Sequence, residues 1–227
     1  MELLDNNTEG GAVWTDQVFF LGVPGTGKSY RCMRQVEVIC RAKIDESGDL
    51  IARRLVVHDP VGSWRREFNV ANPQTGERIE LEPWREARKS APFTYIENDN
   101  DLLAALEHET DCVFALDELG DVDDAGGDAM RMFRAMCRKR RHRRITIMAC
   151  SQRPSRIPVE AYAFCSKVLI FRIQYRDDLD RLAGLWPTRE AGKQAVETIS
   201  NLSIQKHQFI MLRMTEKTEK ELQNQSH

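Results

Sequence analysis

The sequence predicts an α/β fold in which a mainly parallel central sheet is covered by helices on both faces. Two observations support this prediction. Short apolar runs with the length of buried strands alternate along the chain with segments whose apolar residues recur at helical spacing. The first apolar run also leads directly into a glycine-rich loop and then a helix, and such strand–loop–helix units build parallel sheets.

The expected elements follow the chain in a regular order. Strands are expected in QVFFLG (17–22), RRLVVHD (53–59), PFTYIEN (92–98), DCVFALDELG (111–120), ITIMACSQ (145–152), SKVLIFRI (166–173) and HQFIMLRM (207–214). Helices are expected over 28–44, with an apolar stripe of Cys32, Val36, Ile39 and Ile44, and over 98–109, 128–143, 177–186 and 189–202. The second helix begins with Asn and Asp residues that suit a helix cap.

We expect one domain over residues 16–214. A chain of 227 residues is long enough for a single α/β core. Residues 1–15 are expected to form a flexible arm, and the charged and polar residues 215–227 a solvated tail. Residues 60–92 are polar and contain Pro and Gly, which favours an excursion from the core such as a hairpin.

Composition limits the possible partners and compartments. The net charge is −2, so any nucleic-acid site must come from local clustering of basic residues. None of the six cysteines forms a C-x-x-C pair, and we expect buried, reduced thiols. No apolar run reaches the roughly 18 residues of a membrane span. The acidic N-terminus lacks the basic start of a signal peptide, so we expect a cytoplasmic protein.

The stretch FFLGVPGTGKSY contains G-x-x-x-x-G-K-S, from Gly22 to Ser29. Its glycines allow backbone N–H groups to surround phosphate oxygens, and the helix N-terminus that follows also favours an anion. Lys28 is expected to reach the β- and γ-phosphates of ATP, and the Ser29 hydroxyl to bind Mg²⁺. The residues expected to contact the nucleotide are Gly22, Pro24, Gly25, Thr26, Gly27, Lys28, Ser29 and Tyr30.

Two further strand ends carry polar side chains suited to this chemistry. Asp117 and Glu118 follow the apolar run Val113–Leu116, at the end of a strand where α/β sheets bind ligands. Asp117 is expected to hold Mg²⁺ and Glu118 to activate the attacking water. Gln152 ends the strand 145–152, where its amide can hydrogen-bond both the γ-phosphate and the lytic water.

The segment RMFRAMCRKRRHRR is strongly basic. Arg131, Arg134, Arg138 and Arg141 recur at spacings of three, four and three, which predicts a shared helix face beside an apolar stripe of Met130, Phe133 and Cys137. A solvated face is the ordinary explanation of a charge run, but like charges this dense repel unless an anion faces them. The phosphates of bound DNA would supply such an anion. The ATP of a neighbouring subunit would also supply one, if an arginine of this run is inserted into that subunit's site.

These motifs together resemble the HerA/FtsK superfamily of P-loop ATPases. Within it, the chain is similar to the genome-packaging ATPases of tailless, membrane-containing, tectivirus-like phages and related archaeal viruses. The matching stretches are Gly22 to Ser29, FALDE at 114–118, RHRRITIMACSQRPSRIP at 141–158 and the later CSKVLIFRIQYRDDLDRLAGL. The resemblance covers residues 17 to 213.

The resemblance implies a RecA-like ATPase domain that forms a homo-oligomeric ring, expected to be a hexamer. It implies hydrolysis of Mg-ATP and the pumping of double-stranded DNA, held by its phosphates, into a preformed capsid. Capsid or portal-vertex proteins are then the expected partners, and the host cytoplasm and the packaging vertex of the virion the expected locations. By its position shortly before the glutamine strand, Arg141 is the candidate arginine finger acting in trans.

Two other function classes remain open at this point. A small-molecule kinase would also use GVPGTGKS, but it must exclude water, and a carboxylate such as Glu118 poised for water is counterproductive there. A non-motor assembly protein that binds ATP as a switch predicts slow hydrolysis that DNA does not stimulate.

Overall fold

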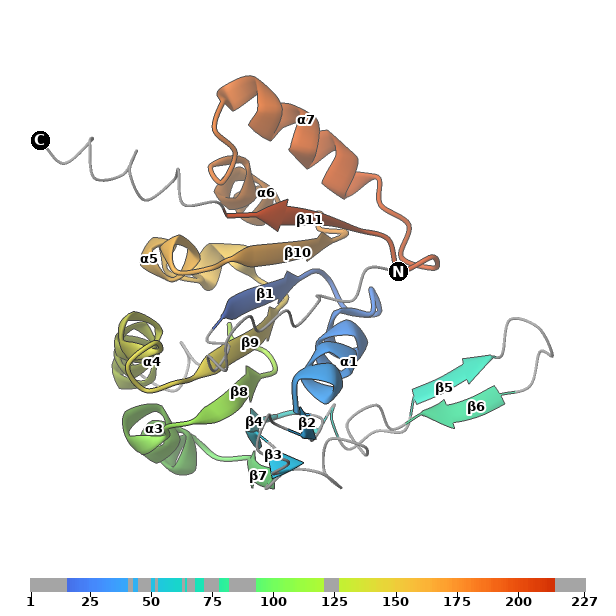
Figure 1. Ribbon diagram of the computed structural model, residues 1–227. Helices are drawn as coiled ribbons and strands as arrows, with labels where there is room; N and C mark the ends of the chain where they lie inside the picture. Colours follow the sequence, from blue (N-terminus) through green and yellow to red (C-terminus); the bar gives the residue numbers. More distant parts are fainter. Residues whose placement is uncertain are drawn as a thin grey trace, which may run out of the picture.

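The computed structural model (Figure 1) describes residues 16–40, 43–44, 50–51, 53–62, 64, 68–71, 78–81, 93–120 and 127–214. These residues contain a seven-stranded sheet with the order β11-β10-β1-β9-β8-β4-β7. Neighbouring strands are parallel throughout, except that β11 runs antiparallel to β10. The strands are β1 (Gln17–Leu21), β4 (Arg54–His58), β7 (Phe93–Ile96), β8 (Cys112–Leu116), β9 (Thr146–Ser151), β10 (Lys167–Phe171) and β11 (Phe209–Arg213).

Helices cover both faces of the sheet, which confirms the predicted fold class. Figure 1 shows α1 on one side and α3, α4 and α5 on the other, with α6 and α7 at the β10–β11 end. The bounds are α1 (Lys28–Cys40), α3 (Asp99–His108), α4 (Gly127–Lys139), α5 (Val159–Ala163), α6 (Arg176–Ala183) and α7 (Arg189–Ser200), with a short 3-10 helix η3 (Pro154–Arg156).

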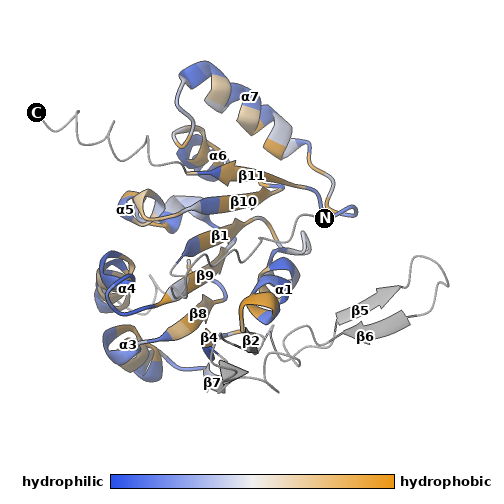
Figure 2. Cartoon of the chain, in the orientation of Figure 1, coloured by the Kyte–Doolittle hydropathy of each residue, from blue (hydrophilic) through white to orange (hydrophobic). Residues whose placement is uncertain are grey.

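The inner strands β1, β4, β8, β9 and β10 bury side chains on both faces, which explains why they are nearly continuous apolar runs (Figure 2). Successive residues of a strand point to opposite faces. Phe19 therefore packs in the cluster beneath α3 to α5, while its neighbours Val18 and Phe20 pack beneath α1. Leu182 of α6 and Ile199 of α7 belong to the same cluster as Phe19.

Local capping explains where two helices begin. The Asn98 side chain accepts a hydrogen bond from the backbone N–H of Asp101 at the start of α3, as the sequence predicted. Thr188 does the same for Ala191 at the start of α7. Both caps satisfy N–H groups that have no partner within their own helix.

Two predicted helices end four residues earlier than expected. The helix predicted over 28–44 ends at Cys40, and Ile44 lies instead in β2 (Lys43–Ile44), which pairs with β3 (Leu50–Ile51). The helix predicted over 128–143 ends at Lys139. Residues 140–144 form a turn in which Ile145 N–H donates to the Arg140 carbonyl and Arg144 has a φ of 53°. This left-handed residue redirects the chain into β9.

The excursion predicted over residues 60–92 contains an antiparallel hairpin, as expected. Its strands are β5 (Phe68–Ala71) and β6 (Arg78–Leu81). The pair forms a two-stranded sheet of its own. The expected arm 1–15, the tail 215–227 and the acidic residues 121–126 lie outside the described residues.

All six cysteines lie in the described residues, where they are buried and form no disulfide. Burial raises the pKa of Cys40 to about 12 and that of Cys112 to about 11, so both thiols stay neutral and pack as small apolar groups. None of the helices in the described ranges combines the length and apolarity that a bilayer crossing requires.

The crossing of α6 and α7 generates a stability prediction. A Cβ atom at Gly192 would lie 2.6 Å from the carbonyl oxygen of Ala183, which is backbone and cannot swing away. We expect Gly192→Ala to destabilise the fold by about 1–3 kcal/mol, although alanine favours helices. Thermal unfolding followed by circular dichroism measures this effect.

The matched control is Gly127→Ala, because a Cβ at this first residue of α4 meets no atom of the described residues within 4 Å. We expect it to leave the unfolding temperature unchanged or to raise it. A Gly192→Ala protein at least as stable as the wild type would contradict the close packing of α6 on α7.

Candidate nucleotide site

The predicted site residues converge because three neighbouring parallel strands end at one edge of the sheet. Strand β9 lies between β1 and β8. The phosphate loop leaves the end of β1, the two carboxylates follow β8 and Gln152 follows β9. Gly22 N–H donates to the Ser151 carbonyl at 3.1 Å, so the loop begins beside the end of β9. Ligands of α/β sheets bind at such an edge.

The phosphate loop depends on its glycines. Gly25 and Gly27 have φ values of 77° and 88°, which L side chains rarely adopt. A Cβ at Gly22 would lie 2.7 Å from the Cβ of Phe171, so the loop lies directly against β10. The Thr26 hydroxyl donates to the Val23 carbonyl at 2.8 Å and closes the loop on itself.

A buried set of polar contacts joins the loop to the other two strand ends. The Lys28 ammonium lies 3.0 Å from Glu118 Oε1, and the two side chains are only 7% and 10% exposed. The same Glu118 oxygen accepts a hydrogen bond from the Gln152 amide at 2.6 Å. The Ser29 hydroxyl donates to Asp117 Oδ1 at 3.0 Å. The structure thus brings all five predicted side chains together.

Glu118 holds its position through an uncommon backbone conformation. Its φ is 57°, in the left-handed region that non-glycine residues seldom occupy. On either side, Asp117 N–H donates to the His58 carbonyl at 2.9 Å, and Leu119 N–H to the Cys150 carbonyl at 2.7 Å. These bonds fix the chain to β4 and β9. Strain of this kind persists where surrounding structure over-determines it, which is typical of functional sites.

Ser29 and Asp117 are a donor set that fits Mg²⁺. A hydroxyl and a carboxylate oxygen are hard ligands, and this ion binds proteins through one or two carboxylates together with substrate phosphates. Asp117 is 1% exposed and lies at the start of the loop after β8. Behind it, burial raises the pKa of the Cys150 thiol well above its ordinary value, so this group adds no negative charge.

A cleft of about 510 Å³ opens beside these groups. It is lined by Val23, Pro24, Glu118, Gly120, Gln152, Arg153, Gln174 and Tyr175. A second hollow of similar size, about 520 Å³, lies between η3, α5 and α6 and has no residue of the phosphate loop in its lining. The first therefore marks the side of the site from which Glu118 and Gln152 are reached.

The sequence prediction missed several residues around the loop. His207, in the turn before β11, approaches Gly27 so closely that a Cβ there would lie 3.0 Å from its Nδ1. No sequence pattern links these residues, since 179 positions separate them along the chain. Arg153 and Tyr175 line the cleft. The only available sequence signal was the position of Arg153 directly after Gln152, and it was not recognised. Tyr30, predicted to contact nucleotide, lies half-buried in the first turn of α1.

The basic run divides into structural and exposed members. Met130, Phe133 and Cys137 form the predicted buried stripe. Arg140 is buried beneath the Phe164 ring, and Arg143 donates to the backbone carbonyls of Leu106 and Glu109. Arg131 pairs with Asp128, and Arg144 with Asp111. These four arginines have contacts within their own chain, so the exposed part of the basic run is smaller than the sequence suggested.

The remaining basic side chains, Arg134, Arg138, Lys139 and Arg141, are exposed. Within the described part of the chain none of the four has an acidic partner. Because α4 ends at Lys139, Arg141 lies in the following turn and not on the helix face predicted for it. This turn precedes β9, whereas Gln152 follows it, so Arg141 and its own chain's site lie at opposite ends of that strand, on the order of 20 Å apart.

Comparison with known proteins supports the fold. No protein-family model and no curated protein matches the sequence. Among solved structures, the chain is similar to the genome packaging NTPase B204 from Sulfolobus turreted icosahedral virus 2 in complex with sulfate. The TM-score is 0.52 and the identity 14%, over 88% of this chain and 92% of that one.

The chain has a RecA-like P-loop NTPase fold. Other matches are weaker. The complex of B204 with ATP-gammaS has a TM-score of 0.49 and 14% identity, over 88% of this chain and 93% of that one. The conjugation coupling protein TcpA of pCW3 has a TM-score of 0.46 and 12% identity, over 74% of this chain and 51% of that one. At such identities the predicted resemblance is confirmed for the fold.

The geometry of Glu118 generates a prediction about nucleotide turnover. We expect Glu118→Gln to retain binding of ATP, because glutamine preserves the size and one acceptor oxygen of the side chain. We expect its rate of phosphate release to fall by about 10²–10⁴-fold, since the substitution removes the group that the sequence predicts to be the base for water. Equilibrium titration with a fluorescent ATP analogue and a phosphate-release assay measure the two properties separately.

Glu160→Gln is the matched control, because Glu160 is an exposed acid in α5. It should change neither property. Wild-type turnover in Glu118→Gln would exclude the assigned role.

Proposed function

We propose that this protein is an oligomeric ATPase that translocates double-stranded DNA into a preformed viral capsid. Hydrolysis of ATP at the edge of the sheet drives movement of the DNA. The observation that carries the proposal is the contact of one carboxylate, Glu118, with both Lys28 and Gln152. These contacts support a role for Glu118 as the base for a water that attacks the γ-phosphate of a bound nucleotide.

Each residue of the nucleotide site has a defined task in this reaction. The backbone of Gly25 and Gly27 surrounds the phosphates, and Lys28 neutralises charge on the β- and γ-phosphates. Ser29 and Asp117 would hold Mg²⁺, which would supply positive charge near the transferring group. Glu118 accepts a proton from the attacking water, and the Gln152 amide orients that water against the γ-phosphate. A small-molecule kinase would be impaired by this water-activating pair.

The place of Arg141 supports the proposed ring of subunits, for which the resemblance suggests a hexamer. The side chain is exposed and lies at the end of β9 remote from the site of its own chain. It therefore acts only on a neighbour's nucleotide, where a guanidinium stabilises charge in the transition state. Within the described residues, this turn supplies no arginine finger to the ATP site of its own chain.

Binding of DNA rests on the exposed basic residues of α4. Arg134, Arg138 and Lys139 carry positive charge without an acidic partner in the described part of the chain, although the whole protein has a net charge of −2. Phosphate contacts of this kind carry no base specificity, as a translocating motor requires. The shared fold with a viral genome packaging NTPase supports this assignment. Capsid or portal-vertex proteins would then be its docking partners, in the host cytoplasm and at the packaging vertex.

The first test is steady-state hydrolysis across protein concentration, with and without double-stranded DNA. We expect phosphate release that rises faster than linearly with protein, increases with DNA, and disappears in Lys28→Ala and Arg141→Ala. Mixing Arg141→Ala with Glu118→Gln should restore part of the activity, because some interfaces then combine an intact site with an intact arginine. Arg176→Ala is the control, since Arg176 is 92% exposed on α6.

Two results would contradict the motor. Slow turnover that is linear in protein and indifferent to DNA and Arg141 would favour an ATP-dependent switch. Phosphate transfer to a small acceptor in place of water would favour a kinase.

A second test addresses the binding of DNA by α4. We expect Arg134→Ala combined with Arg138→Ala to weaken binding to double-stranded DNA of any sequence. The slope of log K against log salt should become shallower by about 0.9 for each DNA phosphate that the protein no longer neutralises. Fluorescence anisotropy at several salt concentrations measures this slope.

The matched control for this pair is Arg176→Ala with Arg189→Ala, which removes the same amount of exposed charge from α6 and α7. It should leave both the affinity and the slope nearly unchanged. An equal effect of both pairs would remove the assignment to α4.

A further inference from the structure

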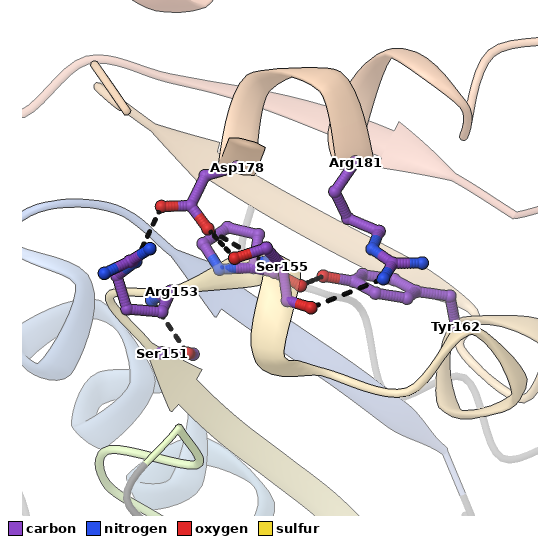
Figure 3. A network of polar contacts seen from close by, with 7 residues as sticks. Ser151, Arg153, Ser155, Tyr162, Asp178 and Arg181 are labelled. Carbon is purple, nitrogen blue, oxygen red and sulfur yellow. Dashed lines mark hydrogen bonds and ion pairs between the residues drawn. The ribbon is translucent and has the colours of Figure 1, made fainter. Parts of the chain in front are cut away.

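The segment that follows Gln152 is fastened to α6 by one carboxylate, Asp178 (Figure 3). Arg153 Nε donates to Asp178 Oδ2 at 3.0 Å. The backbone N–H and the hydroxyl of Ser155 both donate to Asp178 Oδ1, at 2.9 and 2.6 Å. The chain from β9 into η3 is therefore tied to the first turn of α6.

Asp178 is fully buried, at 0% exposure. An isolated buried carboxylate is strongly unfavourable unless it is paired and hydrogen-bonded. Here the three donors and the nearby helix N-terminus supply that compensation. Removal of the Arg153 cation alone would leave the charge of Asp178 buried without a counter-ion. The need to compensate this charge therefore fixes the position of Arg153.

The Arg153 guanidinium is held at a second point. Its central carbon lies 5.0 Å from the centroid of the Tyr175 ring, close enough for a cation–π contact. Its side chain is 38% exposed and lines the same cleft as Glu118 and Gln152. Only Nε is engaged by Asp178, and within the described residues no acceptor contacts the two terminal nitrogens.

A guanidinium with a fixed plane and two free terminal nitrogens is suited to bind phosphate oxygens. Side-chain entropy is already restricted by Asp178 and Tyr175, so little more is given up when such an anion binds. The cleft is lined by Glu118 and Gln152, the groups assigned to the attacking water beside the γ-phosphate, and by the loop residues Val23 and Pro24.

We propose that Arg153 is a further residue of the nucleotide site, which contacts the γ-phosphate of ATP bound to its own chain. Asp178 is its positioning residue. This inference rests on the proposed ATPase site. It adds a means of distinguishing ATP from ADP, because ADP lacks the group that Arg153 contacts. It also makes η3 and α6 respond to hydrolysis, since Ser155 shares the carboxylate that holds Arg153.

The alternative is that Arg153 only balances the charge of Asp178. The two roles separate in the ratio of affinities for ATP and ADP. Removal of a purely structural arginine lowers stability and affects both nucleotides alike. Removal of a γ-phosphate contact weakens ATP binding and leaves ADP binding nearly unchanged.

The test compares Arg153→Lys and Asp178→Asn with the wild type in titrations of a non-hydrolysable ATP analogue and of ADP, both with Mg²⁺. Lysine keeps the charge beside Asp178 but lacks the fork of donors. We expect its affinity for the ATP analogue to fall about tenfold, with less than a twofold change for ADP. Asp178→Asn should shift the ratio in the same direction, and the double variant should add little. Arg176→Lys on α6 is the matched control.

An unchanged ratio in a folded Arg153→Lys protein, or equal losses for both nucleotides, would overturn the proposal. If that variant does not fold, Arg153→Met combined with Asp178→Asn removes both charges while the asparagine oxygen still accepts from Ser155. The same ratio then decides the question. Two other results would instead reject the nucleotide site itself. One is a wild-type protein that binds neither nucleotide, and the other is a Lys28→Ala protein that binds ATP and ADP as tightly as the wild type.

Discussion

The insertion of β9 between β1 and β8 is the constraint on which the site depends. In this strand order the ends of β1 and β8 are separated by one strand, so Lys28 and Glu118 meet across the end of β9. The side chain of Gln152 then has a carboxylate within reach at 2.6 Å. A direct β1–β8 pairing would remove Gln152 from between the two groups. Backbone hydrogen bonding of the sheet thus determines which side chains share one small polar volume.

The polar set is stable because apolar packing surrounds it on both faces of the sheet. Cys32 and Met33 of α1 lie beneath one face, and Leu119 packs with the cluster on the other. Low local polarity strengthens each contact within the set and raises the cost of an unpaired charge. A phosphate loop, two carboxylates and an amide can be held within hydrogen-bonding distance only if almost every polar atom has a partner.

Much of the fold followed from the sequence, because buried strands and amphipathic helices have different periodicities. The seven strands of the main sheet were predicted for this reason, whereas the phosphate loop was predicted from its G-x-x-x-x-G-K-S motif. The strand order was not, since both neighbours of β9 are equally apolar and no local pattern encodes pairing. The end of α4 at Lys139 was missed because the basic residues beyond it are good helix formers, while the left-handed Arg144 leaves no signature in sequence. Lys28, Ser29, Asp117, Glu118 and Gln152 were found by motif. Arg153 was not, since its significance depends on Asp178, 25 residues away.

The opposite placement of Arg141 and Gln152 around β9 has a mechanical consequence. In the proposed ring, this strand would span the distance between two successive ATP sites, with one end in its own site and the other in its neighbour's. Six residues fixed in the interior of a sheet are stiff along their length. A displacement of Gln152 when phosphate departs would therefore be conveyed as a push or pull on the adjacent subunit. Sequential hydrolysis around the ring would need no separate signalling element. The strand that ends beside Gln152 in one ATP site begins at the turn that carries Arg141 into the neighbouring ATP site.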